Sequence, residues 1–206
     1  MLLIQSYFPH IDHTQRNRFQ KLIEVLPALN QQVNVISRQD IGSLEEKHIL
    51  HSLSIAKKFT FTKGCSVTDV GTGGGFPGIP LAILFPRANF TLVDSIEKKI
   101  RLVRDIIAYL ELPNAAAIRG RMEKLDLATD FVVSRAVAQL SQLERWTRHL
   151  IRPGQVSDVP NGLISLKGGD LELEIQPFLD RVEVYPLSAW FKEPFFSTKK
   201  IVYLKK

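Results

Sequence analysis

The stretch that decides the fold is residues 69–78, DVGTGGGFPG. A glycine-rich turn of this kind lets the backbone approach a ligand closely and points the first amides of the next helix toward it. Residues 66–70, SVTDV, precede the turn and have the apolar, β-branched character of a short buried strand. Pro77 and Pro80 stand where the following helix begins, a place that tolerates a missing N–H. We therefore expect a strand–turn–helix unit with a ligand at its turn.

The same rhythm of strand, turn and helix repeats after this unit. Residues 90–94, FTLVD, predict a second strand that ends in a carboxylate, and Ser95 is expected to cap the next helix, which ends before Pro113. Parallel strands need crossover connections, so the alternation indicates a parallel sheet covered by helices. Three more strands are expected, at residues 115–118, 131–134 and 163–166, with an amphipathic helix between the last two.

The C-terminal part breaks this alternation. Residues 182–185 and 200–204 are both β-rich, and no convincing helical pattern lies between them. A last strand that runs antiparallel to the others fits this better than another crossover.

The first sixty residues favour helices. Phe19, Leu22 and Leu26 repeat at the spacing of one buried helix face, and Pro27 is expected to end that helix. Residues 43–46, SLEE, match a capping box that would begin another helix. The predicted organisation is an N-terminal helical extension, residues 1–60, followed by a ligand-binding α/β domain, residues 61–206.

Composition sets the class of protein. Of 206 residues 45% are hydrophobic and 23% charged, which is typical of a soluble globular domain. No apolar run approaches the roughly 20 residues that span a bilayer, and no signal peptide is evident, so we expect a cytoplasmic protein without a membrane partner. The single cysteine, Cys65, excludes an internal disulfide and a cysteine-based zinc cluster. A formal charge of +6 leaves both a nucleic-acid partner and an ordinary basic surface open.

Two carboxylates indicate the kind of ligand. Asp69 precedes the glycines, and Asp94 ends the second strand, where it can accept the ribose hydroxyls of a nucleoside cofactor. NAD and S-adenosylmethionine both fit a carboxylate at this place. The acid before the turn, the crowding of glycines at 71, 73, 74, 75 and 78, and the β-rich C-terminal part favour S-adenosylmethionine.

Five segments of the chain belong together: DVGTGGGFPGIPLA (69–82), LVDS (92–95) with Lys98, VSRAVA (133–138), KHILHSL (47–53) and LKGG (166–169). They span most of residues 30 to 170 and resemble one known family, the bacterial small-subunit ribosomal RNA guanine-N7 methyltransferases, also called glucose-inhibited division protein B. Two departures stand out: Gly74 replaces a commoner proline, and His51 stands where an aspartate is common, so no family role is carried over to His51.

The resemblance implies a Rossmann-like class I S-adenosylmethionine methyltransferase, with a seven-stranded, mostly parallel sheet and an antiparallel last strand. It also implies methyl transfer from S-adenosylmethionine to N7 of a guanosine in 16S ribosomal RNA of the small ribosomal subunit, by a monomeric enzyme. Guanine N7 is an unprotonated ring nitrogen, so we expect neither a metal ion nor a general base. The alternatives are a methyltransferase of this fold for another RNA or a small metabolite, an NAD-dependent oxidoreductase, and a cofactor-binding RNA chaperone without turnover.

Site residues follow from the turn and from the resemblance. No metal ligand is predicted. For Lys98, Arg121 and Lys167 the simple alternative is a solvated surface charge. The predicted cofactor-binding residues are Asp69, Gly71, Gly73, Gly75, Phe76, Asp94, Met122, Glu123 and Arg135; the predicted RNA-binding residues are Lys98, Arg121 and Lys167; the predicted catalytic residues are Arg135, Lys167 and Arg121.

Overall fold

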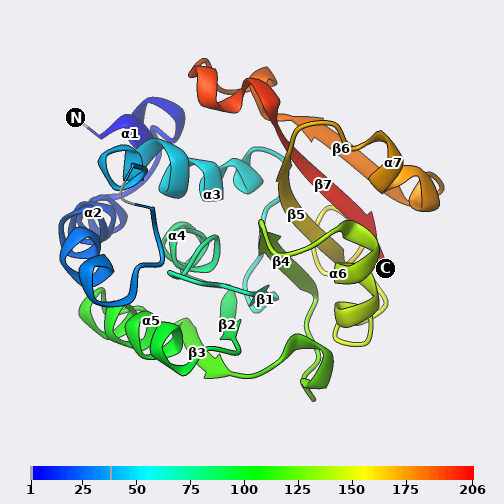
Figure 1. Ribbon diagram of the computed structural model, residues 1–206, viewed down its shortest axis with the longest axis horizontal. Coiled ribbons are helices and arrows are strands. Elements are labelled where there is room, and N and C mark those ends of the chain that lie inside the picture. The colour runs from blue at the N-terminus through cyan, green and yellow to red at the C-terminus, as the bar shows by residue number, and fades with distance from the viewer. Residues whose placement is uncertain (1, 38) are drawn as a thin grey trace.

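The computed structural model describes residues 2–37 and 39–206 and contains one seven-stranded sheet (Figure 1). The strand order is β3-β2-β1-β4-β5-β7-β6, and β7 runs antiparallel to both of its neighbours. This confirms the predicted α/β architecture with its antiparallel last strand. The strands are β1 (Ser66–Val70), β2 (Asn89–Asp94), β3 (Ala115–Arg119), β4 (Phe131–Arg135), β5 (Gly162–Gly168), β6 (Val182–Pro186) and β7 (Lys199–Lys205).

Helices cover both faces of this sheet. The α-helices are α1 (Leu3–Tyr7), α2 (His13–Val33), α3 (His51–Leu53), α4 (Gly78–Leu84), α5 (Glu97–Tyr109), α6 (Leu140–Thr147) and α7 (Glu172–Ile175). Short helical turns are η1 (Ile41–Ser43), η2 (Glu45–Leu50, a π-helix), η3 (Ser54–Lys57), η4 (Met122–Lys124), η5 (Gln176–Phe178), η6 (Leu187–Ala189) and η7 (Pro194–Thr198).

The central strands bury both of their faces in two separate hydrophobic cores. Neighbouring residues of β4 point to opposite sides, so Val133 lies in one core and Val132 in the other. The first core also holds side chains of α2, α4 and α5, and the second holds those of α6. Figure 1 shows α1 to α5 gathered on one side of the sheet and α6 and α7 on the other.

The N-terminal helices follow the predicted hydrophobic face but not the predicted end. Phe19, Leu22 and Leu26 are fully buried, as expected. The expectation that Pro27 ends the helix is wrong, because α2 continues to Val33. Pro27 lies on the exposed side of α2, while the buried face continues through Asn30. Tertiary packing of that face therefore offsets the roughly 3 kcal/mol that an interior proline costs a helix.

Two predicted helix caps are also wrong. Within the described residues Ser43 does not cap the helical segment that follows it, and Glu45 instead accepts a hydrogen bond from the amide of Ile4 at 3.0 Å. The helix after β2 begins at Glu97 with Ile96 at its N-cap and without a side-chain cap, and Asp94 accepts a 2.9 Å hydrogen bond from the amide of Ile96 just before it. Both cases reflect contacts that a four-residue pattern does not contain.

The topology places a binding site at the centre of the sheet. The chain leaves β1 toward β2 on one side, whereas β4 pairs with β1 on the other side. Ligands of open α/β sheets bind at the carboxyl ends of strands where the order switches in this way.

No helix in the described part of the chain is long and apolar enough to cross a membrane.

Candidate functional site

A hollow of about 380 Å³ opens at the carboxyl ends of β1 to β4. We call it the glycine cleft. It gathers the end of the glycine turn, the carboxylate that ends β2, the turn after β3 and one face of α6. Its lining includes Gly71, Asp94, Lys99, Met122, Glu123 and Trp146.

The glycine turn is shaped by close packing beneath it and open space above it. Gly71 has a φ of 68°, and a Cβ added there would meet a methyl group of Val137 at 2.6 Å. Gly75 is also left-handed, with a φ of 92°, and packs against Ile79. At Gly73 a Cβ would meet nothing nearer than the Gly71 carbonyl at 4.0 Å. The turn therefore leaves room for a ligand at Gly73, with its backbone exposed to that ligand.

Asp94 is held firmly at the wall of the glycine cleft. Its side chain is almost fully buried, and Oδ2 accepts a 3.1 Å hydrogen bond from the amide of Gly73. Oδ1 accepts the amide of Ile96, and the ammonium of Lys99 lies 3.8 Å from Oδ2. The carboxylate is thus preorganised and still faces the cleft, which suits recognition of ligand hydroxyls.

Asp69 lies beneath the turn rather than in the cleft lining. Its Oδ2 accepts hydrogen bonds from the Thr72 hydroxyl at 2.6 Å and from the amide of Gly78 at 2.8 Å. Oδ1 is buried and has no hydrogen-bond partner among the described residues. Burial raises the pKa of the Asp69 carboxyl to about 7. The residue closes the turn with one oxygen and leaves the other without a partner among the described residues.

Of the other residues predicted at the carboxyl edge of the sheet, some line the glycine cleft and others do not. Met122 and Glu123, in the turn after β3, line the glycine cleft. Arg121 lines it too, with a side chain 70% exposed and 3.7 Å from Glu123. Lys98 is exposed on α5, and in the described structure it lines none of the main hollows. Its neighbour Lys99 faces the cleft instead.

Trp146 was missed as a site residue. The sequence places it on an amphipathic helix, where a tryptophan more often belongs to the core or its rim. In the structure it is half-buried and lines the glycine cleft.

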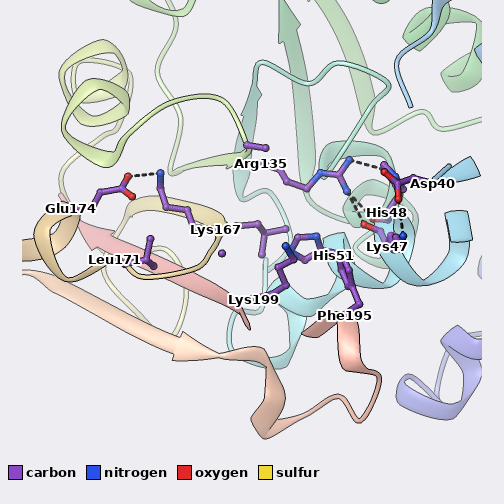
Figure 2. Close-up of a pocket in the computed structure, with 13 residues that line it drawn as sticks. Asp40, Lys47, His48, His51, Arg135, Lys167, Leu171, Glu174, Phe195 and Lys199 are labelled. Carbon is purple, nitrogen blue, oxygen red and sulfur yellow. Dashed lines mark hydrogen bonds and ion pairs between the residues drawn. The ribbon is translucent and has the colours of Figure 1, made fainter. Parts of the chain in front are cut away.

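A second hollow, of about 450 Å³, lies beside the glycine cleft, and Ala136 lines both. We call it the basic cavity. It is formed by the ends of β4 and β5, the segment from Asp40 to His51, and the start of β7. Figure 2 shows the Arg135 guanidinium reaching toward one wall and Lys167 turned toward the other. Residues that line it include Asp40, Lys47, His48, His51, Arg135, Lys167, Phe195 and Lys199.

Arg135 joins the sheet to the N-terminal segment. Its guanidinium approaches the carbonyl groups of Lys47 and His48 at 3.4 Å and the Nδ1 atom of His48 at 3.0 Å. The same group lies over the ring of Phe76, 5.0 Å from its centre. Phe76 is therefore buried under Arg135, not in the lining of the glycine cleft. Arg135 lines the basic cavity and directly precedes Ala136, which lines both hollows.

Lys167 is paired in this structure. Its ammonium lies 2.5 Å from a carboxylate oxygen of Glu174 and donates to the carbonyl of Ala138 at 2.7 Å. The side chain is only 11% exposed. Contact with an RNA phosphate would require Lys167 to leave Glu174.

Comparison with known proteins shows which family the chain belongs to. The family model described as rRNA small subunit methyltransferase G, GidB, matches residues 15–184. The chain belongs to this family. The resemblance seen in the sequence is thereby confirmed.

Relatives within the rRNA small subunit methyltransferase G family match almost the whole chain. The enzyme of that name from Porphyromonas gingivalis is 48% identical over 203 residues, which cover 98% of this chain and 92% of the relative. The one from Bacteroides thetaiotaomicron is 48% identical over 203 residues, covering 98% of each. A SAM-dependent methyltransferase from Aquifex aeolicus has the same fold, with a TM-score of 0.56 and 18% identity over 82% of this chain and 98% of the other.

The basic cavity keeps the histidine that binds Arg135 in its neutral form. A guanidinium can only donate hydrogen bonds, so Nδ1 of His48 must accept the bond from Arg135. Burial, followed by the charge of Arg135, lowers the pKa of His48 from 6.5 to about 4. The folded protein therefore resists protonation of this ring at pH values where the unfolded chain accepts a proton.

This difference predicts an acid-dependent loss of stability. As the pH falls from 6.5 toward 4, His48 binds a proton in the unfolded state but stays neutral in the folded state, so the free energy of unfolding decreases. Between pH 7 and pH 5 the wild-type chain should lose roughly 1–2 kcal/mol more than His48→Gln. Urea unfolding at the two pH values measures this, with the exposed His149→Gln as the matched control. Equal losses in wild type and His48→Gln would contradict it.

Proposed function

We propose that this chain transfers the methyl group of S-adenosylmethionine to N7 of a guanosine in 16S ribosomal RNA, with the cofactor in the glycine cleft. As a member of the rRNA small subunit methyltransferase G family, it is an S-adenosylmethionine-dependent methyltransferase of small-subunit rRNA. The observation that carries the proposed arrangement is the Asp94 carboxylate, fixed at the wall of the glycine cleft beside the open space over Gly73.

The glycine cleft fits the cofactor on several counts. Asp94 would accept the two ribose hydroxyls, and the turn at Gly71 and Gly73 would bring its backbone against the ligand. Met122 and Glu123 would hold the adenine between an apolar side chain and a hydrogen-bond acceptor. The free oxygen of Asp69 beneath the turn would meet the ammonium of the methionine part, directly or through water. Arg135 and Phe76 then form the boundary toward the acceptor.

For this reaction the protein mainly has to position the acceptor base relative to the methyl group. Bound S-adenosylmethionine supplies an electrophilic methyl group on a sulfonium, and guanine N7 offers an in-plane lone pair with no proton to remove. The residues of the site therefore have to align the base with the cleft, an effect that can supply about 7–11 kcal/mol. We assign this alignment to Arg135, with Arg121 and Lys167 holding the RNA backbone near it.

The exposed cations at this edge should contribute to RNA affinity. Arg121→Ala and Lys98→Ala should each weaken binding of 16S rRNA and lower the slope of log affinity against log salt by about one unit. Cofactor affinity should change little. Filter binding at roughly 50 to 250 mM salt measures the RNA affinity and its salt slope.

Lys63→Ala is the matched control for these two variants, because Lys63 is exposed just before β1, at the opposite edge of the sheet. An unchanged salt slope together with a large loss of cofactor affinity would place Arg121 in the cofactor site instead. Lys167→Ala should affect RNA binding less than Arg121→Ala, because Lys167 must first give up its ion pair with Glu174.

We further propose that the chain acts as a monomer in the cytoplasm. The function itself is tested by incubating the purified chain with methyl-labelled S-adenosylmethionine and separated ribosomal RNAs. Label should enter 16S rRNA and not 23S rRNA. A chain that binds 16S rRNA and cofactor without transferring label would instead be an RNA chaperone.

A further inference from the structure

The basic cavity has the position of an acceptor site. It adjoins the glycine cleft along Ala136, at the carboxyl ends of β4 and β5. Its volume of about 450 Å³ falls in the range of small-ligand pockets. Phe195 supplies an aromatic face in its wall, and enzymes that act on a base commonly hold the extruded base against such a face.

The hydrogen-bond acceptors of this wall are mostly occupied. Asp40 accepts from Lys47 at 2.7 Å and from the hydroxyl of Ser37 at 2.8 Å. Glu174 is paired with Lys167 and also accepts the amide of Leu140 at the start of α6. These carboxylates are therefore engaged in holding the cavity together.

His51 is different. The residue is only 6% exposed, and its Nε2 atom has no hydrogen-bond partner among the described residues. The ring packs edge-on against Phe195, with centroids 5.3 Å apart, and Figure 2 shows it beside Lys199 in the wall of the basic cavity. Leaving a buried polar atom without a partner costs free energy, so such an atom in a cavity wall calls for a ligand.

The protonation state of the ring decides what Nε2 can do. Burial and the neighbouring charges of Arg135 and Lys199 lower the pKa of His51 well below 6.5, so the ring is neutral. A neutral imidazole carries one proton and one lone pair, and Nε2 is the acceptor when the proton is on Nδ1.

We propose that the basic cavity binds the acceptor guanine, with N7 toward Ala136 and with His51 Nε2 accepting the N1–H of the base. This inference rests on the proposed function and names the base-reading site within it. N7 and N1 lie on neighbouring edges of a purine, on either side of O6, so a base can present N7 to the glycine cleft while its N1 lies against the wall of the cavity. The flexible side chain of Lys199, whose ammonium lies 4.9 Å from the centre of the Phe195 ring, moves aside as the base enters.

This contact separates guanine from adenine. Guanine carries a hydrogen on N1, whereas adenine has a lone pair there, which would face the lone pair of His51. A matched hydrogen bond to a base edge commonly gives discrimination of about 5- to 150-fold. N7 is a lone-pair nitrogen in both purines, so the methylated atom alone does not distinguish them.

The test uses 16S rRNA ligated to carry guanine, inosine or 2-aminopurine at the methylated position. Inosine keeps N1–H and O6 and lacks the 2-amino group, whereas 2-aminopurine keeps the amino group and lacks both N1–H and O6, so the His51 variants below separate the two losses. Single-turnover methylation by the wild-type chain should be similar for guanine and inosine and about 10- to 100-fold slower for 2-aminopurine. Comparable rates on guanine and 2-aminopurine would overturn the proposal without any variant.

Variants of His51 make the assignment specific. His51→Phe keeps a flat ring without an acceptor, so it should slow guanine and inosine about 10- to 100-fold and leave 2-aminopurine unchanged. His51→Asp restores an acceptor and should restore the preference. His149→Ala, an exposed histidine, should behave as wild type. An equal loss on all three bases would show a merely structural role and overturn the proposal, whereas a wild-type chain that never methylates guanine N7 would overturn the proposed function itself.

Discussion

Replacing Asp94 by alanine is expected to weaken S-adenosylmethionine binding by about 100-fold or more while the fold survives. The ribose hydroxyls lose a charged acceptor, and each such hydrogen bond contributes roughly 1.5–3 kcal/mol. The variant also releases the Gly73 amide, which Asp94 binds at 3.1 Å, so the turn loses part of its preorganisation. Calorimetric titration measures the affinity, and circular dichroism checks the fold.

Glu97→Ala is the matched control for this loss. Glu97 begins α5 three residues after Asp94, but its carboxylate faces Arg101, Arg104 and Arg119. It should bind the cofactor as wild type does. An unchanged dissociation constant in Asp94→Ala would remove Asp94 from the cofactor site.

Arg135→Lys is expected to lower the single-turnover methylation rate about 100-fold at saturating cofactor, a loss typical of misplaced positioning groups. Lysine keeps the charge but cannot reproduce the planar fork that contacts His48 and lies over Phe76. The boundary between the glycine cleft and the basic cavity would then lose its shape. Quench-flow with labelled cofactor measures the rate.

Calorimetry on Arg135→Lys separates the two roles predicted for this residue. A large loss of cofactor affinity would assign Arg135 to the methionine carboxylate, and a small one would assign it to the acceptor side. Arg145→Lys, exposed on α6, is the control. A rate equal to that of wild type would show that Arg135 is not a catalytic or positioning residue.

The part of the site that local sequence predicts well is the part built by consecutive residues. The turn at residues 69–78 and the carboxylate at the end of β2 belong to one strand–turn–helix rhythm, and they meet at the glycine cleft. Helix boundaries are less secure. The helix α5 begins at Glu97, one residue later than a cap at Ser95 predicts, and Lys99 rather than Lys98 faces the cleft. Neighbouring helix residues point about 100° apart, so a shift of one residue changes which lysine meets a ligand.

The basic cavity could not be predicted in the same way. Arg135 meets His48, which lies 87 residues earlier in the chain, and no local pattern encodes that contact. Lys167 pairs with Glu174 only because the chain folds back from β5 to α7. Pro27 shows the opposite error, in which a sound local rule yields to the packing of a buried helix face. Long-range contacts decide each of these cases.

Nucleoside mass spectrometry of 16S rRNA tests the central claim most directly. The purified chain is incubated with unmodified 16S rRNA and trideuteromethyl-labelled S-adenosylmethionine, and the RNA is digested to nucleosides. We predict labelled 7-methylguanosine, one per RNA molecule at most, and none with Asp94→Ala. Label in another nucleoside, or no label in 16S rRNA while another RNA or a small metabolite acquires it, would contradict the account.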